Sequence, residues 1–252
     1  MSQRILVTRP LGQAAELAEL LAERGLVPVI VPTVEIDAES AAEDLDAALA
    51  SLEGADWLIL TSANGVEALV ARLAACGHAL PDTLRVAAVG PATASALRAA
   101  GLRVDHVPDE YLTVAIAGGL GEVRGRRVVL ARADAATPDL RDALVERGAD
   151  VEEVVAYRTV EGPASSRDRL HAALHADLAG TAFTSSSTVR GLLRLASTVD
   201  RQRARAVPAF CIGPVTAETA RHFGFDLAAV AAEHTASGMA DTIAAHFAQA
   251  PR

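Results

Sequence analysis

The stretch Ala87-Ala88-Val89-Gly90-Pro91-Ala92-Thr93-Ala94 predicts a buried strand that turns at Gly90 into a helix. Gly90 is interpreted as a turn residue whose backbone conformation a Cβ atom would block. Pro91 suits the first helical position, where no amide donor is needed. Thr93 then falls in the first turn, beside backbone N–H groups that the helix leaves unpaired. In α/β folds, such a junction between a strand end and a helix start binds anionic ligands.

The same pattern recurs 123 positions later (213 − 90), in Phe210-Cys211-Ile212-Gly213-Pro214-Val215-Thr216-Ala217. Three further pairs share this offset: Thr61-Ser62 with Thr184-Ser185, Arg9 with Arg132, and Gly25 with Gly148. One constant offset across several elements predicts an ancient duplication, so that the chain holds two units of one architecture.

Strands alternate with helices along both halves, which predicts an α/β fold with parallel sheets built from βαβ units. Five strands in each unit indicate a flavodoxin-like sheet. The expected strands are 5–8, 27–31, 57–61, 86–89, 103–107, 127–131, 151–155, 181–184, 209–212 and 227–230. Two arrangements remain open. The units are contiguous and divide near Arg124, or the chain crosses between them twice through 31–35 and 155–160, which then pair as a small hinge.

Composition excludes several classes of protein. The 252 residues are 51% hydrophobic but only 3% aromatic, which suits parallel strands covered by Ala-rich helices. The net charge of −9 argues against nucleic acid and anionic membranes as partners. All 23 basic residues are arginine, so a Schiff-base, pyridoxal-phosphate or P-loop lysine is excluded. Neither a signal peptide nor a transmembrane run is visible, and Cys76 and Cys211 are unpaired, so a cytoplasmic protein is expected.

The loops after the strands carry hydroxyl groups, glycines and two arginines, a set that suits a ligand with several carboxylates or phosphates. If the two lobes face each other, these loops line one cleft from both sides. The candidate binding residues are Arg9, Ser62, Asn64, Gly90, Thr93, Arg132, Ser185, Ser186, Gly213 and Thr216. The alternative for Ser62, Asn64 and Ser185 is that they only cap helices, with Asn64 and Glu67 spaced as in a capping box. The alternative for Arg9 and Arg132 is solvation or pairing with a surface carboxylate.

Tyr157 is the candidate catalytic residue. It lies midway along a predicted hinge strand, two residues from Val155, and is expected to share the face of Val155. It is either a half-buried packing residue or a phenol that points into the cleft and donates a proton. His171 and His175 have the spacing of a metal-binding pair, but no third ligand is near them in the sequence, so no metal site is expected.

Six segments, taken in order, resemble the uroporphyrinogen-III synthase family: Val7–Pro10, Thr61–Val66, Val89–Ala94, Tyr157–Thr159, Phe183–Ser187 and Ile212–Ala217. The resemblance implies two flavodoxin-like lobes, each with a parallel five-stranded sheet, joined by a two-stranded β linker. One lobe would hold residues 1–34 and 162–252, and the other 37–154. The linker strands would be 31–37 and 155–161.

The resemblance also implies a reaction. Hydroxymethylbilane, a linear tetrapyrrole with eight carboxylates, would lose water and cyclise with its terminal ring inverted to give uroporphyrinogen III. The enzyme would act as a cytoplasmic monomer without cofactor or metal. Tyr157 matches the family's functionally important tyrosine, and Ser62, Thr93, Ser185 and Thr216 match positions of substrate contacts. The competing hypothesis is a two-lobed sensor that binds a small polyanion without chemistry.

Overall fold

The computed structural model describes residues 3–108 and 115–249. The chain divides into two compact units: unit 1 comprises Met1–Glu35 and Val160–Arg252, and unit 2 comprises Ile36–Thr159. Both divisions of the chain fall inside strands, β3 (Val34–Asp37) and β7 (Asp150–Glu161). The chain therefore enters and leaves unit 2 in extended conformation.

Unit 1 has a five-stranded parallel sheet in the order β10-β9-β8-β1-β2. Its strands are β1 Arg4–Val7, β2 Val27–Ile30, β8 Gly180–Phe183, β9 Ala209–Cys211 and β10 Leu227–Val230. Its helices are α1 Leu11–Glu23, α7 Arg167–Leu174, α8 Ser186–Leu195, α9 Thr198–Ala206, α10 Pro214–His222 and α11 Ala236–Gln249, with a 3₁₀ turn at Ala164–Ser166. This order is the flavodoxin-like one that the sequence predicts.

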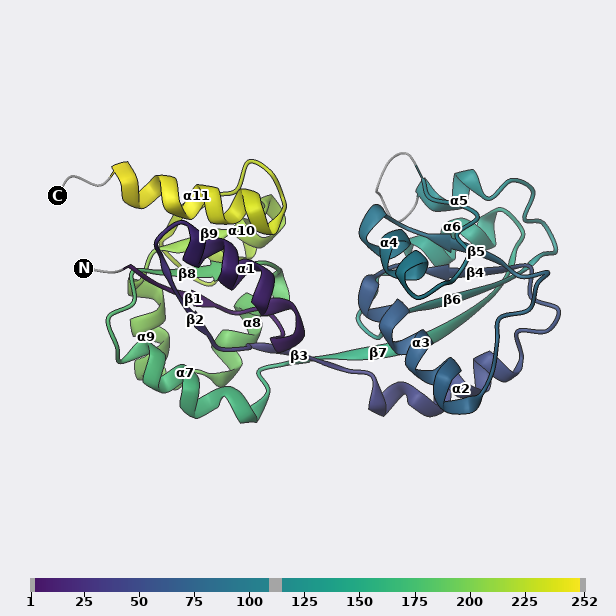
Figure 1. The fold of residues 1–252 in the computed structure, drawn as a ribbon, viewed down its shortest axis with the longest axis horizontal. Coiled ribbons are helices and arrows are strands. Elements are labelled where there is room, and N and C mark those ends of the chain that lie inside the picture. Colours follow the sequence, from purple (N-terminus) through teal and green to yellow (C-terminus); the bar gives the residue numbers. More distant parts are fainter. Residues whose placement is uncertain (1–2, 109–114, 250–252) are drawn as a thin grey trace. The chain divides into compact units, whose positions relative to one another are not determined.

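Side chains on both faces of this sheet are buried, because successive strand residues point to opposite sides. Ile5 and Val7 pack against α1 and α11, which lie side by side (Figure 1). Leu6 packs on the other side with Phe183 and residues of α7 to α10. The strands are therefore near-continuous apolar runs, as expected for a parallel sheet covered on both faces.

Unit 2 has a second five-stranded sheet in the order β3-β7-β6-β4-β5. Its remaining strands are β4 Trp57–Leu60, β5 Arg85–Ala88 and β6 Arg127–Ala133. Its helices are α2 Ala42–Ala50, α3 Ala63–Cys76, α4 Pro91–Ala99, α5 Ala115–Gly119 and α6 Asp139–Glu146, with a 3₁₀ turn at Glu39–Ala41. Helices α2, α3 and α4 cover one face, and α5 and α6 cover the other.

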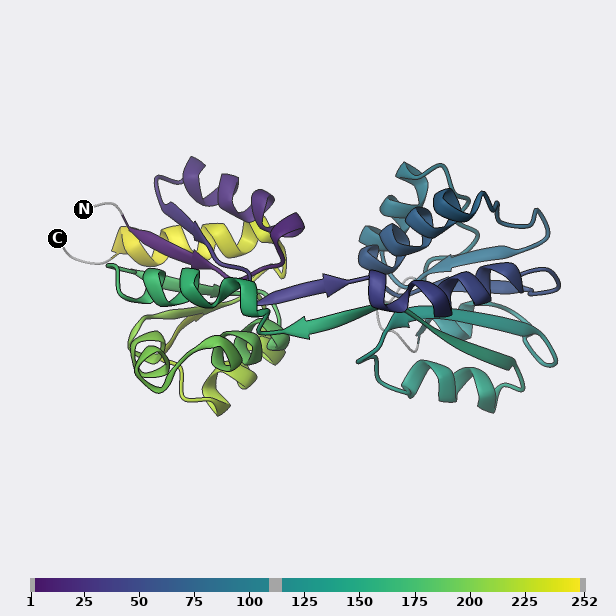
Figure 2. The ribbon, with the colours of Figure 1, turned by 90° about the horizontal axis from the view of Figure 1, so that it is seen from below.

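The second sheet corrects the prediction of two fully parallel sheets. Strands β4 to β7 are parallel, but β3 and β7 run in opposite directions (Figure 2), so the sheet is mixed. The expected strand 103–107 is reduced to one isolated bridge between Ala87 and His106. The side chain of Asp105 accepts the Val86 N–H instead, at 2.7 Å. A side chain thus takes one of the ladder positions that a fifth parallel strand would have filled.

Each unit combines elements from both halves of the repeat. Unit 1 takes β1 and β2 from the first half and β8 to β10 from the second. Unit 2 takes β4 and β5 from the first half and β6 and β7 from the second. Residues related by the offset of 123 therefore lie in different units, and each unit holds one copy of every repeated motif.

Thr33 fixes the start of β3 to unit 1. Its hydroxyl donates to the backbone oxygens of Thr188 at 2.8 Å and of Thr8 at 3.2 Å, and its carbonyl accepts the N–H of Gly162 at 2.9 Å. A Cβ at Gly191 would clash with the Thr33 carbonyl, so α8 needs glycine where the Thr33 backbone crosses it. Hydrogen bonds and close backbone packing therefore fix the unit-1 ends of β3 and β7.

Candidate functional site

Parallel pairing brings the loops after neighbouring strands to one edge of each sheet. In unit 1, these loops follow β1, β8 and β9, and in unit 2 they follow β4 and β5, with the end of β6 beside them. We call the first group the unit-1 edge: Arg9, Ser185, Ser186, Gly213 and Thr216. We call the second group the unit-2 edge: Ser62, Asn64, Gly90, Thr93 and Arg132. The structure thus collects the ten candidate binding residues into two sets of five.

Ser62 connects the unit-2 edge to Tyr157. Ser62 is the N-cap of α3, where its Oγ accepts the N–H of Gly65 at 3.1 Å. The same Oγ lies 3.0 Å from the phenol oxygen of Tyr157, 95 residues away in the chain. Ser62 is therefore a helix cap, as one interpretation proposed, and also the hydrogen-bond partner of the candidate catalytic residue.

The face on which Tyr157 lies was predicted wrongly. Arg132 pairs with Val155, but the next residue, Ala133, pairs with Tyr157, so one extra residue is inserted in β7. Such a bulge reverses the alternation of faces. Tyr157 consequently faces the same side as Val154 and packs in the core beneath α2, α3 and α4.

Burial makes the ring of Tyr157 rigid. The residue is only 6% exposed, so it is more enclosed than a phenol standing free in a cleft. Its oxygen nevertheless reaches Ser62, which is half-buried at the edge of the unit. The phenol oxygen is therefore held at the Ser62 hydroxyl while the ring stays in the core.

The hydrogen-bond count leaves one proton available. Ser62 and Tyr157 carry one hydroxyl hydrogen each, and one of the two is used between the oxygens. Neither hydroxyl has a further acceptor among the residues that the structure describes. Whichever group donates internally, the other has a hydrogen to offer to a ligand.

Ser185 occupies the same position in unit 1 but has different partners. It is the N-cap of α8 in a capping box, with its Oγ accepting the N–H of Thr188 at 3.2 Å. Its second partner is the hydroxyl of Ser187, at 2.8 Å. Ser186 is bound to the hydroxyl of Thr219 at 2.7 Å. Among the described residues, the unit-1 edge therefore presents two separate pairs of hydroxyls, and no phenol bonds to them.

Gly90 and Gly213 begin α4 and α10 with the same backbone geometry. Their φ values are −156° and −167°, which is ordinary extended backbone, so the expectation that Gly90 needs glycine for its conformation is wrong. A Cβ would meet open space at Gly90, and the ring of His234 at 3.4 Å at Gly213. The first junction is therefore uncovered by other residues of the described chain, and the second is covered by an imidazole.

Thr93 and Thr216 lie in the first turns of α4 and α10, as predicted, and each is 5% exposed. Within the described part of the chain, neither hydroxyl has a hydrogen-bond partner. Neither oxygen is among the fully enclosed, unpartnered atoms of the described residues, so solvent or a ligand can reach it. The two hydroxyls are therefore available to a polar ligand.

The two repeat-related arginines differ in availability. Arg132 lies inside β6 rather than in a loop, is 2% exposed, and donates to Glu153 at 2.7 Å through both Nε and Nη2. Arg9 lies between β1 and α1, and its ion pair in the described part of the chain is with the exposed Glu16, at 3.5 Å. Arg132 is therefore neutralised in a short, enclosed ion pair, whereas the ion pair of Arg9 is long and exposed on the side of Glu16.

The capping box predicted for Asn64 with Glu67 is wrong, because Asn64 lies within α3, whose cap is Ser62. Burial raises the pKa of the Cys211 thiol to about 12, which suits a structural thiol rather than a reactive one. Tyr111, which follows Pro108 closely in the sequence, lies outside the described residues.

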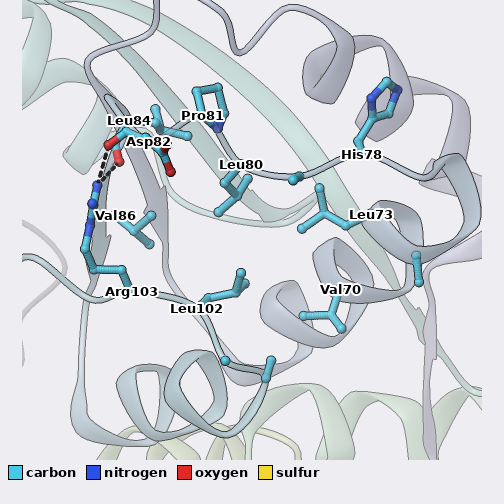
Figure 3. A pocket seen from close by; sticks show the side chains of 14 residues that line it. Val70, Leu73, His78, Leu80, Pro81, Asp82, Leu84, Val86, Leu102 and Arg103 are labelled. Carbon is cyan, nitrogen blue, oxygen red and sulfur yellow. Dashed lines mark hydrogen bonds between the residues drawn. The ribbon is translucent and has the colours of Figure 1, made fainter.

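A separate hollow of about 490 Å³ lies in unit 2, between the ends of α3 and α4 and the beginning of β5. Figure 3 shows Leu73, Leu80 and Leu102 lining it, with Arg103 at one side. Because it lies where β5 begins, it is a strand length away from Gly90, which follows the end of β5. This apolar hollow is therefore separate from the unit-2 edge.

Comparison with known proteins gives consistent results. The family model for uroporphyrinogen-III synthase HemD matches residues 15–241. The chain is 34% identical to a uroporphyrinogen-III synthase of Synechococcus elongatus, over 95% of this chain and 93% of that protein. It is 30% identical to a porphyrin biosynthesis protein HemD of Ruminiclostridium josui, over 95% of this chain and 48% of that protein.

The fold also matches a solved structure. A crystal structure of a mutant uroporphyrinogen III synthase from Thermus thermophilus aligns with a TM-score of 0.68 at 24% identity, over 99% of this chain and 100% of that one. At this identity, the similarity supports the α/β fold. No helix among residues 3–108 and 115–249 has both the length and the apolar character needed to cross a membrane.

Proposed function

The chain belongs to the uroporphyrinogen-III synthase family, and from that premise we propose that Tyr157 is the acid that expels hydroxide from its substrate at the unit-2 edge. The chain is a lyase-class, cyclising enzyme of tetrapyrrole biosynthesis. The observation that supports the role of Tyr157 is its hydrogen bond to Ser62, at 3.0 Å. This bond holds the phenol oxygen next to the loop where an anionic ligand would bind.

The reaction takes up one proton in its first step and releases one proton in its last step. In hydroxymethylbilane, Tyr157 would protonate the hydroxymethyl oxygen as the C–O bond breaks, so that water leaves and an azafulvene cation remains. The substituted carbon of the terminal ring attacks that cation to give a spiro intermediate. Cleavage and re-closure invert the ring, and the proton lost from carbon at the end restores the phenol. The net change is the loss of one water molecule.

Positioning would carry much of the rate, because the later steps require the linear substrate to be held folded. We propose that each edge holds substrate carboxylates through the N–H groups at the starts of its helices, α3 and α4 in unit 2 and α8 and α10 in unit 1. The protein carries a net charge of −9, so long-range attraction does not assist. Arg9, whose ion pair with the exposed Glu16 is 3.5 Å long, would supply the guanidinium contact.

We propose further that β3 and β7 act as a two-stranded linker between two flavodoxin-like units. The chain passes from one unit to the other within each of these strands. Hydrogen bonds of Thr33 hold the unit-1 ends of the strands in place. Bending would then occur in the strands beyond Thr33 rather than at their attachment to unit 1.

The test uses hydroxymethylbilane generated by the preceding enzyme, with the uroporphyrinogen I and III isomers separated by chromatography. Tyr157→Phe removes only the phenol oxygen, and we expect turnover to fall about 100-fold. The variant should still form isomer III at high enzyme concentration, because the binding edges are intact. Ser185→Ala removes a hydroxyl from the position that the repeat relates to Ser62. This variant is the control and should keep most of its activity.

Full turnover by Tyr157→Phe with a normal isomer ratio would show that Tyr157 is not the acid. A folding defect is excluded by comparing the unfolding midpoints of the variant and the parent chain, which should agree because the ring stays in the core.

A further inference from the structure

The side chains of two histidines and one aspartate lie close together in unit 1, away from the unit-1 edge. His171 lies on α7, His175 caps the end of that helix, and Asp200 lies in the first turn of α9. His171 Nδ1 is 3.0 Å from Asp200 Oδ1, and His175 Nε2 is 3.2 Å from the same oxygen. The histidine pair, for which the sequence offered no third ligand, thus acquires one from a helix that follows it by 25 residues.

Asp200 is held in place as a ligand would be. Its side chain is 7% exposed, and its Oδ2 accepts the hydroxyl of Ser197 at 2.7 Å. The carboxylate is therefore fixed, and its Oδ1 lies within hydrogen-bond distance of both imidazoles.

The distances fit a small transition ion. Zinc bonds of about 2.0 Å in a tetrahedron separate neighbouring ligand atoms by roughly 3.3 Å. The two N–O separations, 3.0 and 3.2 Å, are close to that value, and all three ligand atoms lie within 4.8 Å of one another. His171 is 60% exposed, so the cluster is open to solvent on one side and a fourth ligand could be water.

We propose that His171, His175 and Asp200 bind one divalent first-row transition ion, in a site that braces α7 against α9. Two imidazoles and a carboxylate suit Zn²⁺ and its neighbours and do not suit Mg²⁺, which prefers oxygen ligands. The Ser197 hydroxyl would orient the carboxylate from behind, as outer partners do in metal sites.

The position of the site indicates a structural role. His175 precedes the beginning of β8, and Ser197 follows the end of α8, whereas the unit-1 edge lies where β8 ends and α8 begins. The ion would therefore sit at the opposite end of these elements from Ser185. Its binding should change the stability of unit 1 and leave turnover unaltered.

Titration of the untagged, chelator-treated protein with Zn²⁺ tests the proposal by calorimetry and thermal unfolding, with Mg²⁺ in parallel. We expect one Zn²⁺ per chain and a higher melting temperature, with no response to Mg²⁺. His171→Ala and His175→Ala should each weaken binding more than about tenfold, and Ser197→Ala by about tenfold. His78→Ala, which removes an exposed histidine of unit 2, is the matched control and should bind as the parent chain does.

The alternative is a cluster held by N–H···O hydrogen bonds alone. It would give no Zn²⁺ response in the parent chain, or binding that survives both His171→Ala and His175→Ala, and either result overturns the proposal. Loss of binding in His78→Ala would do the same. Far-ultraviolet circular dichroism of each variant separates lost ligands from lost folding.

Discussion

Ser62 and Ser185 are repeat-related helix caps with different hydrogen-bond partners. Both are N-caps in extended conformation, with φ and ψ of −154° and 157° for Ser62 and of −162° and 161° for Ser185. The hydroxyl of Ser62 meets a phenol, whereas that of Ser185 meets another serine. The residue equivalent to Tyr157 (157 − 123) is Val34, which has no hydroxyl. The two positions share their backbone geometry and differ in the side chains around them.

The two repeat-related arginines, Arg132 and Arg9, also differ in their partners. Arg132 of unit 2 is enclosed and paired with Glu153, while Arg9 of unit 1 is only loosely paired. Unit 2 thus holds the candidate proton donor, and unit 1 holds the arginine with the longer ion pair. The two edges therefore differ in their chemistry, and variants of the repeat-related residues test that difference.

The largest expected effect concerns the coupling of Ser62 with Tyr157. If the two hydroxyls act as one unit, Ser62→Ala added to Tyr157→Phe should change turnover little beyond the loss of about 100-fold expected of Tyr157→Phe alone. On the parent background, Ser62→Ala should lower turnover mildly and cost about 1 kcal/mol of stability through the lost cap. A double-mutant cycle measures the coupling, and strictly multiplicative losses would contradict it.

The second prediction concerns the free energies of unfolding of Arg132→Ala and Arg9→Ala, which should differ. Arg132→Ala should lower the free energy of unfolding by about 2 kcal/mol, because it deletes charged hydrogen bonds to Glu153 from a buried position. Arg9→Ala should change stability by less than about 0.5 kcal/mol, since its ion pair is exposed and long. Urea unfolding measures both values, and the kinetics of Arg9→Ala should show a raised KM. Equal stability losses would remove the distinction between the edges.

The smallest expected effect concerns the two glycines. Gly90→Ala places a methyl group in open space, so stability should stay within about 0.5 kcal/mol of the parent chain. If a substrate carboxylate approaches that backbone, the same methyl group should raise KM. Gly213→Ala meets the His234 ring and should cost slightly more stability. An unchanged KM for Gly90→Ala would mean that the open junction does not contact the substrate.

Local features could be predicted from the sequence: the βα units, the caps at Ser62 and Ser185 and the first-turn position of Thr93 and Thr216. These depend on residues within one or two turns of each other, so periodicity and capping chemistry suffice to predict them. The constant offset could be read by comparing the two halves of the sequence. The family resemblance followed from the same segments.

Only the tertiary structure decided the contacts between distant segments. The inserted residue in β7 moved Tyr157 to the other face and onto Ser62, and the extension of β6 enclosed Arg132. Folding also joined Asp200 to His171, and placed β3 antiparallel at the edge of an otherwise parallel sheet. The physical reason is that strand register and helix packing are set by the free energy of the whole core, to which residues far apart in the chain contribute together.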